Sequence, residues 1–500
     1  MPVNPDRQAS TRCPWSLRYL ARLPTAAPNN PGVPRLTATV AHPEPASMPT
    51  NHLDYDDAIE YLYRLINYEK TGDLKPYPFR LKRMHELVRL LDLSGVAGAG
   101  LPLIHIAGTK GKGSTATMAA AMLTACGVRT GLYTSPHLLR IEERFKVDGR
   151  EPSRDEMVEL IAEVREAAQN LAANGFGKPT FFELTTTIAL SYFRRQACQA
   201  VVLEVGLGGL LDSTNVCHPA VTAITSIGLD HQHILGETIA EIAFQKAGII
   251  KPSIPVVCGV REGDAAAVIE QVAREQGAPL FKIGRDFDFR LTLDDDRWGS
   301  RFDLLAKDPR FRPRQGWSLP LPGEHQGHNA AVACALIDLL DPERIRTPLE
   351  AQGRGLAAVR CAGRIERFRL ADGTEVILDT SHNVESISAL CDFLQRTSAS
   401  RLRTVIFGTS KDKPYAGMLA KLGAIADRLI LTRYHGNPRF RETSDLLAAV
   451  RDHGRVIVEE TPSQALRLAQ SFDVPPTEHQ IVICGSFFLA AELLPLIERS

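Results

Sequence analysis

From Tyr55 onward, apolar residues recur at the three- and four-residue spacing of helices that bury one face. One such segment runs from Ala58 to Ile66 and another from Leu81 to Leu91. Further segments with helical spacing are 157–173, 182–193, 238–250 and 329–340. We expect these segments to be helices that cover a core.

Short apolar runs alternate with the helical segments. They are 103–107, 200–204, 221–226 and 256–260, and then 376–379, 404–408, 428–432, 456–459 and 480–484. Short buried strands separated by helices predict parallel sheets covered on both faces. The predicted fold class is therefore α/β, with a smaller, Rossmann-like unit at the C-terminal end. We expect domains at 51–350 and 351–500, joined by a connection that ends near Gly363.

The first 50 residues lack this periodicity and are rich in Pro, Ala, Arg and Asn. They contain no apolar segment of the signal-peptide kind, so we expect a disordered N-terminal extension. Arginines at 7, 12, 18, 22 and 35 leave a transit peptide open, but a dispensable extension, with the start at Met48, is favoured.

Charge and cysteine content exclude several classes of protein. Lys plus Arg equals Asp plus Glu, at 58 each, so no global field attracts nucleic acid or an anionic membrane. No run reaches the about 18 to 20 apolar residues that span a bilayer. The nine cysteines form no C-x-x-C pair, which fits a reducing compartment. We expect a cytoplasmic monomer.

A glycine- and lysine-rich loop follows the predicted strand 103–107. It reads Gly108-Thr109-Lys110-Gly111-Lys112-Gly113-Ser114 and leads into a predicted helix. Backbone N–H groups at such a helix N-terminus bind phosphate oxygens. Lys112 would supply charge to the phosphates, and the hydroxyl of Ser114 or Thr115 would reach Mg²⁺. The loop predicts an ATP-using enzyme; a flexible surface turn is the alternative.

Gly113 separates this loop from the common phosphate loop, in which the hydroxyl residue directly follows the lysine. A GTPase is disfavoured because the dipeptide Asn-Lys of the guanine motif N-K-x-D does not occur in the chain. A nucleotide-dependent binding module is the remaining alternative from another functional class.

Further motifs accompany the loop. In the first half they are Tyr133-Thr134-Ser135-Pro136-His137-Leu138, Leu203-Glu204-Val205-Gly206-Leu207-Gly208-Gly209, Asp212-Ser213-Thr214-Asn215, Leu229-Asp230-His231 and Gln245-Lys246-Ala247-Gly248-Ile249. In the second half they are Gly323-Glu324-His325-Gln326, Asn329-Ala330, Gly363-Arg364-Ile365-Glu366, Asp379-Thr380-Ser381-His382-Asn383 and Gly485-Ser486. This order resembles the folylpolyglutamate synthase and dihydrofolate synthase family, a branch of the Mur ligases whose loop has the same extra glycine.

The resemblance implies a phosphate-loop ATPase domain, a Mur-ligase-like C-terminal domain, and two Mg²⁺ ions beside ATP. The metal-site residues it implies are Ser114, Ser135, Glu204, His231 and Lys246. Glu204 also fits on physical grounds, because it ends an apolar strand, where α/β sheets place ligand-binding groups. Taken singly, His231 would be structural and Lys246 a solvated helix residue. In the family the matching lysine is carbamylated and thus an anion.

In the second half of the chain, Asn329, Arg364 and Asp379 match nucleotide contacts of the family. Their structural alternatives are a helix N-cap, a surface arginine and a turn acid. His382 and Lys413 are candidates for the second chemical step, and Lys411 or Lys413 for charge neutralisation or glutamate binding.

Thr180, Phe181 and Phe182 match a segment that contacts the pterin in family members, and an aromatic ring there can stack on it. Core packing is the alternative. Asp212 could pair with pterin N–H donors. Leu210 stands where the family usually has arginine, and Val384 where it has proline, so we expect altered acceptor recognition and an altered loop.

The resemblance implies ATP-dependent amide formation through an acyl phosphate. We predict addition of L-glutamate to folate, with dihydropteroate as a further acceptor. A Mur-type amino-acid ligase that acts on another carboxylic acid remains the alternative. Retention of Lys112, Glu204, His231 and Lys246 argues against a silent paralogue.

Overall fold

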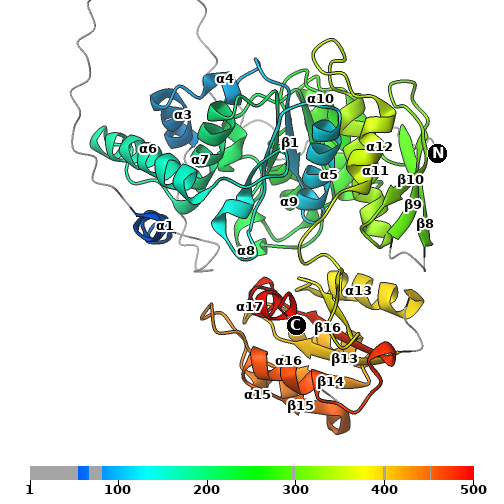
Figure 1. Ribbon diagram of the computed structural model, residues 1–500. Helices are drawn as coiled ribbons and strands as arrows, with labels where there is room; N and C mark the ends of the chain where they lie inside the picture. The colour runs from blue at the N-terminus through cyan, green and yellow to red at the C-terminus, as the bar shows by residue number, and fades with distance from the viewer. Residues whose placement is uncertain (1–53, 67–80, 295–298, 398–400, 451, 500) are drawn as a thin grey trace, which may run out of the picture. The chain divides into compact units, whose positions relative to one another are not determined.

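The computed structural model describes residues 54–66, 81–294, 299–397, 401–450 and 452–499 (Figure 1). The predicted extension at residues 1–50 lies outside the described residues. Residues 53–500 form one compact unit, which contains two large sheets and a small one. Among the described residues, no helix is long and apolar enough to cross a membrane.

The first large sheet has seven strands in the order β3-β2-β4-β1-β5-β6-β7. All neighbouring strands are parallel except β2 and β3. The strands are β1 (Leu103–Ala107), β2 (Thr130–Tyr133), β3 (Phe145–Val147), β4 (Ala200–Glu204), β5 (Val221–Ile224), β6 (Val256–Cys258) and β7 (Leu280–Lys282).

Successive residues of a strand point to opposite faces of the sheet, so a buried apolar strand presents apolar side chains on both faces. Helices cover both faces of this sheet. Ile104 and Ile106 of β1 belong to a core with α5 (Lys112–Ala125), α11 (Glu324–Asp338) and α12 (Leu349–Ala357). Leu103 belongs to a core on the other face. The helices of that core are α1 (Tyr55–Tyr63), α3 (Leu81–Leu90), α6 (Arg154–Ala173) and α7 (Phe181–Arg195). Strands β5 and β6 pack on α9 (Ile239–Ala247) and α10 (Asp264–Glu275).

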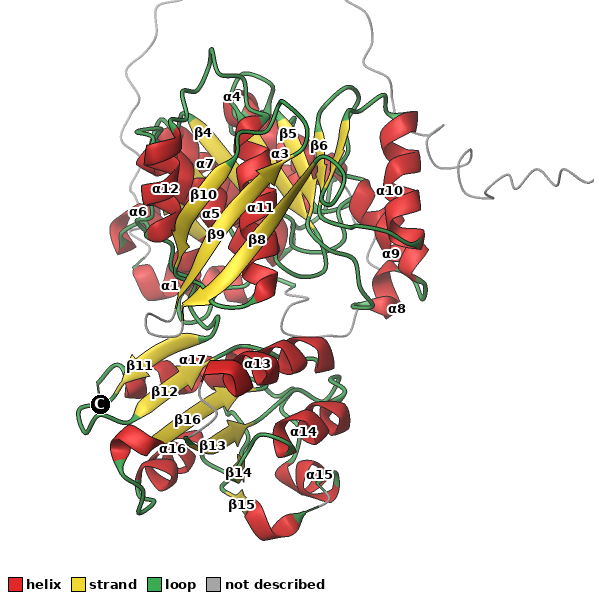
Figure 2. Ribbon diagram, turned by 90° about the vertical axis from the view of Figure 1, so that its right-hand side faces the viewer, coloured by secondary structure: helices red, strands yellow, loops and turns green. Residues whose placement is uncertain are grey.

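Short elements complete this part of the chain. They are α4 (Ser94–Ala97), η2 (Ile141–Arg144), η3 (Ser213–Val216) and α8 (Gln232–Leu235). An antiparallel sheet of β8 (Phe287–Asp294), β9 (Gly299–Ala306) and β10 (Arg314–Leu319) packs on α11 and α12 (Figure 2). We did not predict this small sheet, although Phe287, Phe289 and Leu291 alternate with polar residues as strand residues do.

The second large sheet has the order β11-β12-β16-β13-β14-β15, parallel except for the edge pair β11 and β12. Its strands are β11 (Glu366–Arg369), β12 (Glu375–Leu378), β13 (Leu402–Phe407), β14 (Arg428–Leu431), β15 (Val456–Val458) and β16 (His479–Cys484). One face packs on α13 (Val384–Thr397) and α14 (Tyr415–Gly423), and the other on α16 (Pro462–Gln470) and α17 (Phe487–Ile497). The remaining elements are α15 (Thr443–Ala448), η4 (His453–Arg455) and η5 (Pro476–Glu478).

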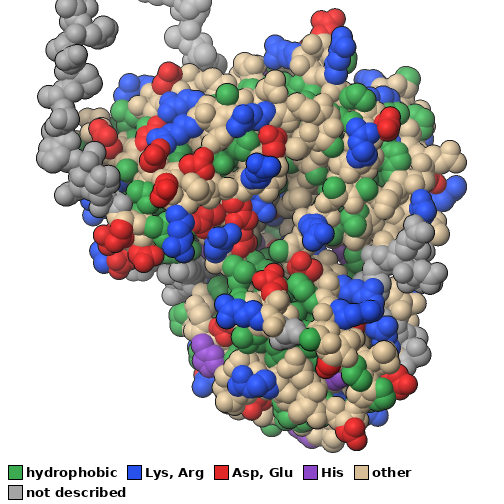
Figure 3. Space-filling model, in the orientation of Figure 1, with side chains coloured by type: hydrophobic (Ala, Val, Ile, Leu, Met, Phe, Trp, Pro, Cys, Tyr) green, Lys and Arg blue, Asp and Glu red, His purple; other side chains and the backbone are tan. Residues whose placement is uncertain are grey.

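The predicted α/β fold with two mainly parallel sheets is confirmed. Boundaries differ by a few residues. The predicted helix 329–340 begins earlier, at Glu324, because Gly323 rather than Asn329 is its N-cap residue. Lys and Arg side chains are interspersed with Asp and Glu on the face seen in Figure 3, as the zero formal net charge leads one to expect.

Candidate active site

A cavity of about 1480 Å³ lies at the carboxyl ends of strands from both large sheets. The loops that follow β1, β2, β4 and β5 line it, and so do those that follow β12, β13 and β16. In α/β sheets this edge is where ligands bind. Residues that lie far apart in the sequence therefore meet here.

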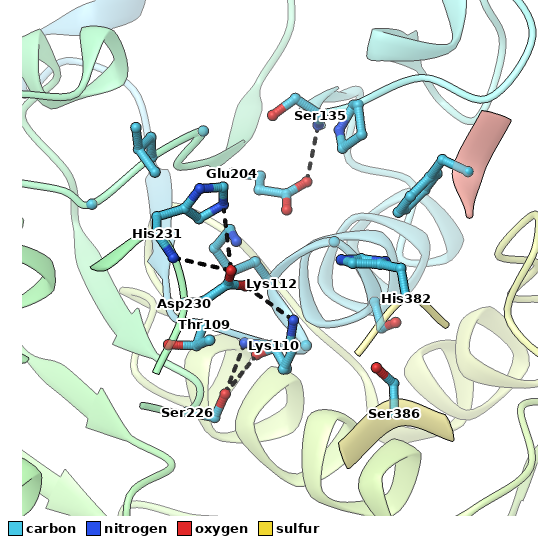
Figure 4. Close-up of a pocket in the computed structure, with 18 of the residues that line it drawn as sticks. Thr109, Lys110, Lys112, Ser135, Glu204, Ser226, Asp230, His231, His382 and Ser386 are labelled. Carbon is cyan, nitrogen blue, oxygen red and sulfur yellow. Dashed lines mark hydrogen bonds and ion pairs between the residues drawn. The ribbon is translucent and has the colours of Figure 1, made fainter. Parts of the chain in front are cut away.

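The glycine- and lysine-rich loop lies on this cavity, fastened to the end of β5. The N–H of Thr109 donates to the carbonyl of Ser226 at 2.7 Å, and the N–H of Lys110 donates to Oγ of Ser226 at 2.9 Å (Figure 4). The hydroxyl of Thr225 donates to the carbonyl of Lys110 at 2.6 Å. These bonds present the N-terminus of α5, which begins at Lys112, to the cavity.

Gly111 has φ of 81°, which favours glycine, and a Cβ there would lie 2.2 Å from Oδ1 of Asn329. Asn329 is 5% exposed, lies inside α11, and donates from Nδ2 to Oε1 of Gln326 at 3.1 Å. The N-cap alternative for Asn329 is therefore wrong. Its side chain packs directly on the phosphate loop.

Lys110 and Lys112 have different surroundings. Nζ of Lys110 lies 3.1 Å from Oδ2 of Asp230, whereas Lys112 lines the cavity beside Gly113 and Ser114 (Figure 4). Burial acts to raise the pKa of Asp230, but Lys110, His231 and Lys413 hold it well below its usual range. Asp230 is thus a permanent anion that engages one loop lysine. Both lysines line the cavity, and Lys110 is in addition paired with Asp230.

Glu204 ends β4, is 4% exposed, and accepts a hydrogen bond from the N–H of Ser135 at 3.1 Å. Its carboxylate lies against the start of α5, since a Cβ at Gly113 would be 3.2 Å from Oε2. Burial raises the pKa of Glu204, while Lys112 and the Ser135 N–H act in the opposite direction. The added glycine of the loop thus makes room for this carboxylate.

The donors near Glu204 are oxygens. Ser114 lines the cavity, whereas Thr115 is fully buried in α5 and is not part of the lining, so of the two predicted hydroxyls only that of Ser114 reaches the cavity. The described residues contain no cluster of three or more His, Cys, Asp or Glu side chains that could hold a metal. A cation here would be bound by one carboxylate, hydroxyls and phosphate oxygens together. These hard oxygen donors fit Mg²⁺.

His231 is the N-cap residue of α8, and Lys246 lies in α9. The His231 side chain is 49% exposed, with Nε2 3.8 Å from Oδ1 of Asp230. Lys246 is buried in α9 and donates from Nζ to the carbonyl of Gly108 at 3.0 Å. Burial, with Lys112 nearby, lowers the pKa of Lys246 to about 7. The solvated-face alternative for Lys246 is wrong.

The second sheet contributes Asp379, which is 5% exposed and accepts from the N–H of Ile365 and the N–H of Ser381, each at 2.8 Å. These bonds fix the loop before α13. Arg364 lies on the cavity wall with Cζ 5.4 Å from the ring centroid of Phe487. Nζ of Lys413 lies 3.4 Å from Oδ2 of Asp412, also on the wall.

His382 follows Asp379 and is half-buried. Its Nδ1 lies 2.9 Å from the carbonyl of Thr380, and because a carbonyl only accepts, Nδ1 carries the proton. Nε2 is then a hydrogen-bond acceptor. Burial, together with Lys110, Lys413 and Arg364, lowers the pKa of His382 to about 3. Such a weak base suits orientation of a donor better than proton removal at neutral pH.

The structure places some of the predicted acceptor-binding residues on the cavity wall and one of them behind it. Thr180 and Phe182 line the cavity, but Phe181 is 1% exposed and does not; it stacks on Tyr63, which is a lining residue. The Thr180 hydroxyl caps α7 by accepting from the N–H of Glu183 at 3.2 Å. Gly206 allows the close approach of Phe182, whose ring would clash with a Cβ at 2.3 Å.

Asp212 also lines the cavity, with both carboxylate oxygens bonded inside its own loop. Oδ2 accepts from the N–H of Leu207 at 2.9 Å, and Oδ1 accepts from the N–H and hydroxyl of Thr214 at 3.0 and 2.5 Å. Burial raises its pKa, and these hydrogen bonds oppose the rise. Asp212 therefore lines the cavity and also stabilises the loop after Glu204.

Comparison with known proteins assigns the two sheets to one kind of enzyme. Residues 106–337 match the Mur ligase middle domain, and residues 363–487 match the Mur ligase, glutamate ligase domain. The chain is 34% identical to the folylpolyglutamate synthase of Lacticaseibacillus casei, over 88% of this chain and 97% of that protein. It belongs to the folylpolyglutamate synthase and dihydrofolate synthase family.

Other members of the family agree with this assignment. The dihydrofolate synthase/folylpolyglutamate synthase of Bacillus subtilis is 31% identical over 88% of this chain and 98% of that protein. The crystal structure of E. coli FolC in complex with DHPP and ADP is 28% identical and covers 91% of this chain and 100% of its own, with a TM-score of 0.76. The predicted family and ligase class are confirmed.

Leu210 and Val384, the two residues that depart from the family pattern, each pack against a neighbouring helix. Leu210 packs at the end of α9, where a Cβ at Gly248 would lie 2.4 Å from it, and it is not part of the cavity lining. Its neighbour Leu211, which is 43% exposed, lines the cavity instead. Val384 is the first residue of α13 and packs on Gly417 of α14.

Sequence reasoning did not single out Asp230, Ser226 or Arg83 as site residues. Arg83 forms a buried ion pair with Glu183, Nε to Oε1 at 2.9 Å, on the cavity wall beside Phe182. Asp230 stood in a quoted motif, but its link to Lys110 joins two loops. Only the fold brings those loops together.

Proposed function

We propose that this chain uses ATP to join L-glutamate to the carboxylate of a folate, and that dihydropteroate is a second acceptor. The observation that carries the proposal is the single cavity that holds Lys112 and Glu204 on one side and Asp379 and His382 on the other. ATP bound at the loop would then meet the acceptor and the glutamate in one place.

The reaction has two steps. An oxygen of the acceptor carboxylate attacks the γ-phosphorus of ATP, which forms an acyl phosphate and releases ADP. The amino nitrogen of glutamate then attacks the acyl carbon, phosphate leaves, and the nitrogen loses a proton as the amide forms. Since neither step needs a covalent enzyme intermediate, the protein acts by placing reactants and neutralising charge.

Each part of the cavity has a task in this scheme. The N–H groups of the loop and Lys112 bind the phosphates, with Gly108, Thr109, Lys110, Gly111 and Gly113 forming the loop backbone. Mg²⁺, held by Glu204 with Ser114 and Ser135 on the same cavity wall, would offset charge on the transferring phosphoryl group. Asn329, Arg364 and Asp379 contact the nucleotide. His231, and Lys246 if its amine were carbamylated, would hold a second ion.

The second step belongs to the loops of the C-terminal sheet. Nε2 of His382 accepts a hydrogen bond from the glutamate amine and orients it toward the acyl carbon, and Lys413 stabilises the departing phosphate. The wall formed by Thr180, Phe182 and Asp212 receives the flat ring of the acceptor.

Purified protein with ATP, Mg²⁺ and radiolabelled glutamate, offered tetrahydrofolate and dihydropteroate separately, tests the proposal. We expect label on both acceptors and loss of labelling in Lys112→Ala. Label on dihydropteroate alone would restrict the activity to dihydrofolate synthesis. No label on either, with label on another carboxylic acid, would establish the alternative Mur-type ligase.

A further inference from the structure

His105 lies in the middle of the first sheet, in the strand that ends at the phosphate loop. The residue is 0% exposed, and β1 pairs with β4 on one side and β5 on the other. Its Nε2 lies 2.8 Å from Oγ1 of Thr214, also fully buried. The chemistry proposed above uses neither side chain.

The direction of this hydrogen bond follows from the groups around it. The Thr214 hydroxyl has one proton, which it donates to the carboxylate of Asp212 at 2.5 Å. Oγ1 of Thr214 must then accept from His105, so the proton of the imidazole is on Nε2. Nδ1 has no hydrogen-bond partner among the described residues, which suits a bare ring nitrogen better than an N–H. Burial lowers the pKa of His105 to about 3, so the ring is neutral near pH 7.

We call the hydrogen bonds from His105 to Thr214 and from Thr214 to Asp212 the relay. The relay ends on the loop that forms the acceptor side of the cavity. We define the acceptor loop as residues 206–212. In this loop the backbone N–H of Leu207 donates to Oδ2 of Asp212, and the hydroxyl of Thr214 donates to Oδ1 of Asp212. Gly206, Leu207, Leu211 and Asp212 all line the cavity. One strand, β1, therefore supports the phosphate loop through its end and the acceptor loop through His105.

We infer that His105 is a positioning residue that fixes the acceptor loop, through Thr214 and Asp212, relative to the phosphate loop. The inference rests on the proposed function, because it assigns the acceptor to the wall that contains Asp212. His105 does not touch the substrates in this account. Loss of its hydrogen bond should weaken acceptor binding while nucleotide binding is kept.

The experiment compares steady-state kinetics for variants at both ends of the relay. His105→Leu removes the bond between His105 and Thr214, and Thr214→Val removes this bond together with the one to Asp212. His105→Gln and Thr214→Ser keep a donor and a hydroxyl. We expect the first pair to raise KM for the folate acceptor roughly tenfold, the size of one buried hydrogen bond, with KM for ATP within about twofold of wild type. The second pair should stay close to wild type.

Thr222→Val is the matched control. Thr222 lies opposite His105 on β5, is equally buried, and donates to the carbonyl of Pro255 rather than toward Asp212. If Thr222→Val raises KM for the acceptor as much as His105→Leu does, or if KM for ATP rises equally, the role of His105 is structural and the inference fails. If His105→Leu does not fold, Thr214→Val tests the connection as a whole, since it removes the bonds of the Thr214 hydroxyl to both His105 and Asp212.

A second readout separates this inference from the proposed function. Hydrogen exchange of the backbone amides of Leu207 and Thr214 should be faster in His105→Leu and unchanged in Thr222→Val. If wild-type protein transfers glutamate to no folate, the proposed function fails while this exchange result still tests the relay. Unchanged exchange in an active enzyme would overturn the relay alone.

Discussion

Gly113 allows a sharp test because replacement by alanine should raise stability and lower activity together. Gly113 lies in the first turn of α5, and a Cβ there would be 3.2 Å from Oε2 and 3.6 Å from Oε1 of Glu204. Ordinary contacts begin near 3.4 Å, so the carboxylate must move by a few tenths of an ångström. Alanine in place of glycine stabilises a helix by up to about 1 kcal/mol.

The expected effect on rate follows from that displacement. A misplacement of ~1 Å near reacting groups can cost about 100-fold, so a shift of a few tenths of an ångström should cost roughly tenfold in kcat/KM. Glutamate incorporation and thermal unfolding are measured on the same preparation. Gly423→Ala is the control, because Gly423 ends α14 with nothing within 4 Å of its Cβ position. Full activity in Gly113→Ala would refute the placement of Glu204 against the loop.

Three further predictions concern other parts of the cavity. Glu183→Gln removes the carboxylate charge that faces Arg83 in a pair whose side chains are only 5% and 6% exposed. It should lower the free energy of unfolding in urea by about 3 kcal/mol, and a loss below about 1 kcal/mol would contradict a buried ion pair. Gly111→Ala forces a side chain into φ of 81° and onto Asn329, so calorimetry should show ADP binding at least about tenfold weaker, whereas wild-type affinity would exclude that contact. Because His382 has a lowered pKa of about 3, its ring stays neutral as pH rises above that value. His382→Asn should therefore lower kcat but leave every inflection of the pH–rate profile between about pH 5 and about pH 9 in place, and a lost inflection would restore His382 as a proton acceptor.

The sequence predicts the phosphate loop well because its signal is local. Strand, glycines, lysine and helix follow one another, and the hydrogen bonds of Thr109 and Lys110 are consequences of that order. Glu204 was predictable for a similar reason, since the last residue of a buried parallel strand lies at the ligand-binding edge. Neither inference needs knowledge of distant parts of the chain.

Contacts between segments that lie far apart in the chain could not be predicted from the sequence. Asn329 packs on Gly111, and Thr214 bonds to His105, across long stretches of chain. Residue type alone favours a helix cap for Asn329 and a solvated helix face for Lys246. Both interpretations are wrong because each side chain is buried. Leu210 shows the converse: a change in a binding motif suggested altered acceptor binding, but the loop directs Leu211 into the cavity and Leu210 toward α9.

The fate of the acceptor's carboxylate oxygen shows whether the reaction passes through an acyl phosphate. Folate labelled with ¹⁸O in that carboxylate is incubated with the protein, ATP, Mg²⁺ and L-glutamate, and the phosphate formed is analysed by mass spectrometry. An acyl phosphate intermediate transfers one labelled oxygen to phosphate for each amide made, with ADP as the nucleotide product. Amide formation with unlabelled phosphate, or with AMP in place of ADP, would exclude an acyl phosphate formed at the γ-phosphorus.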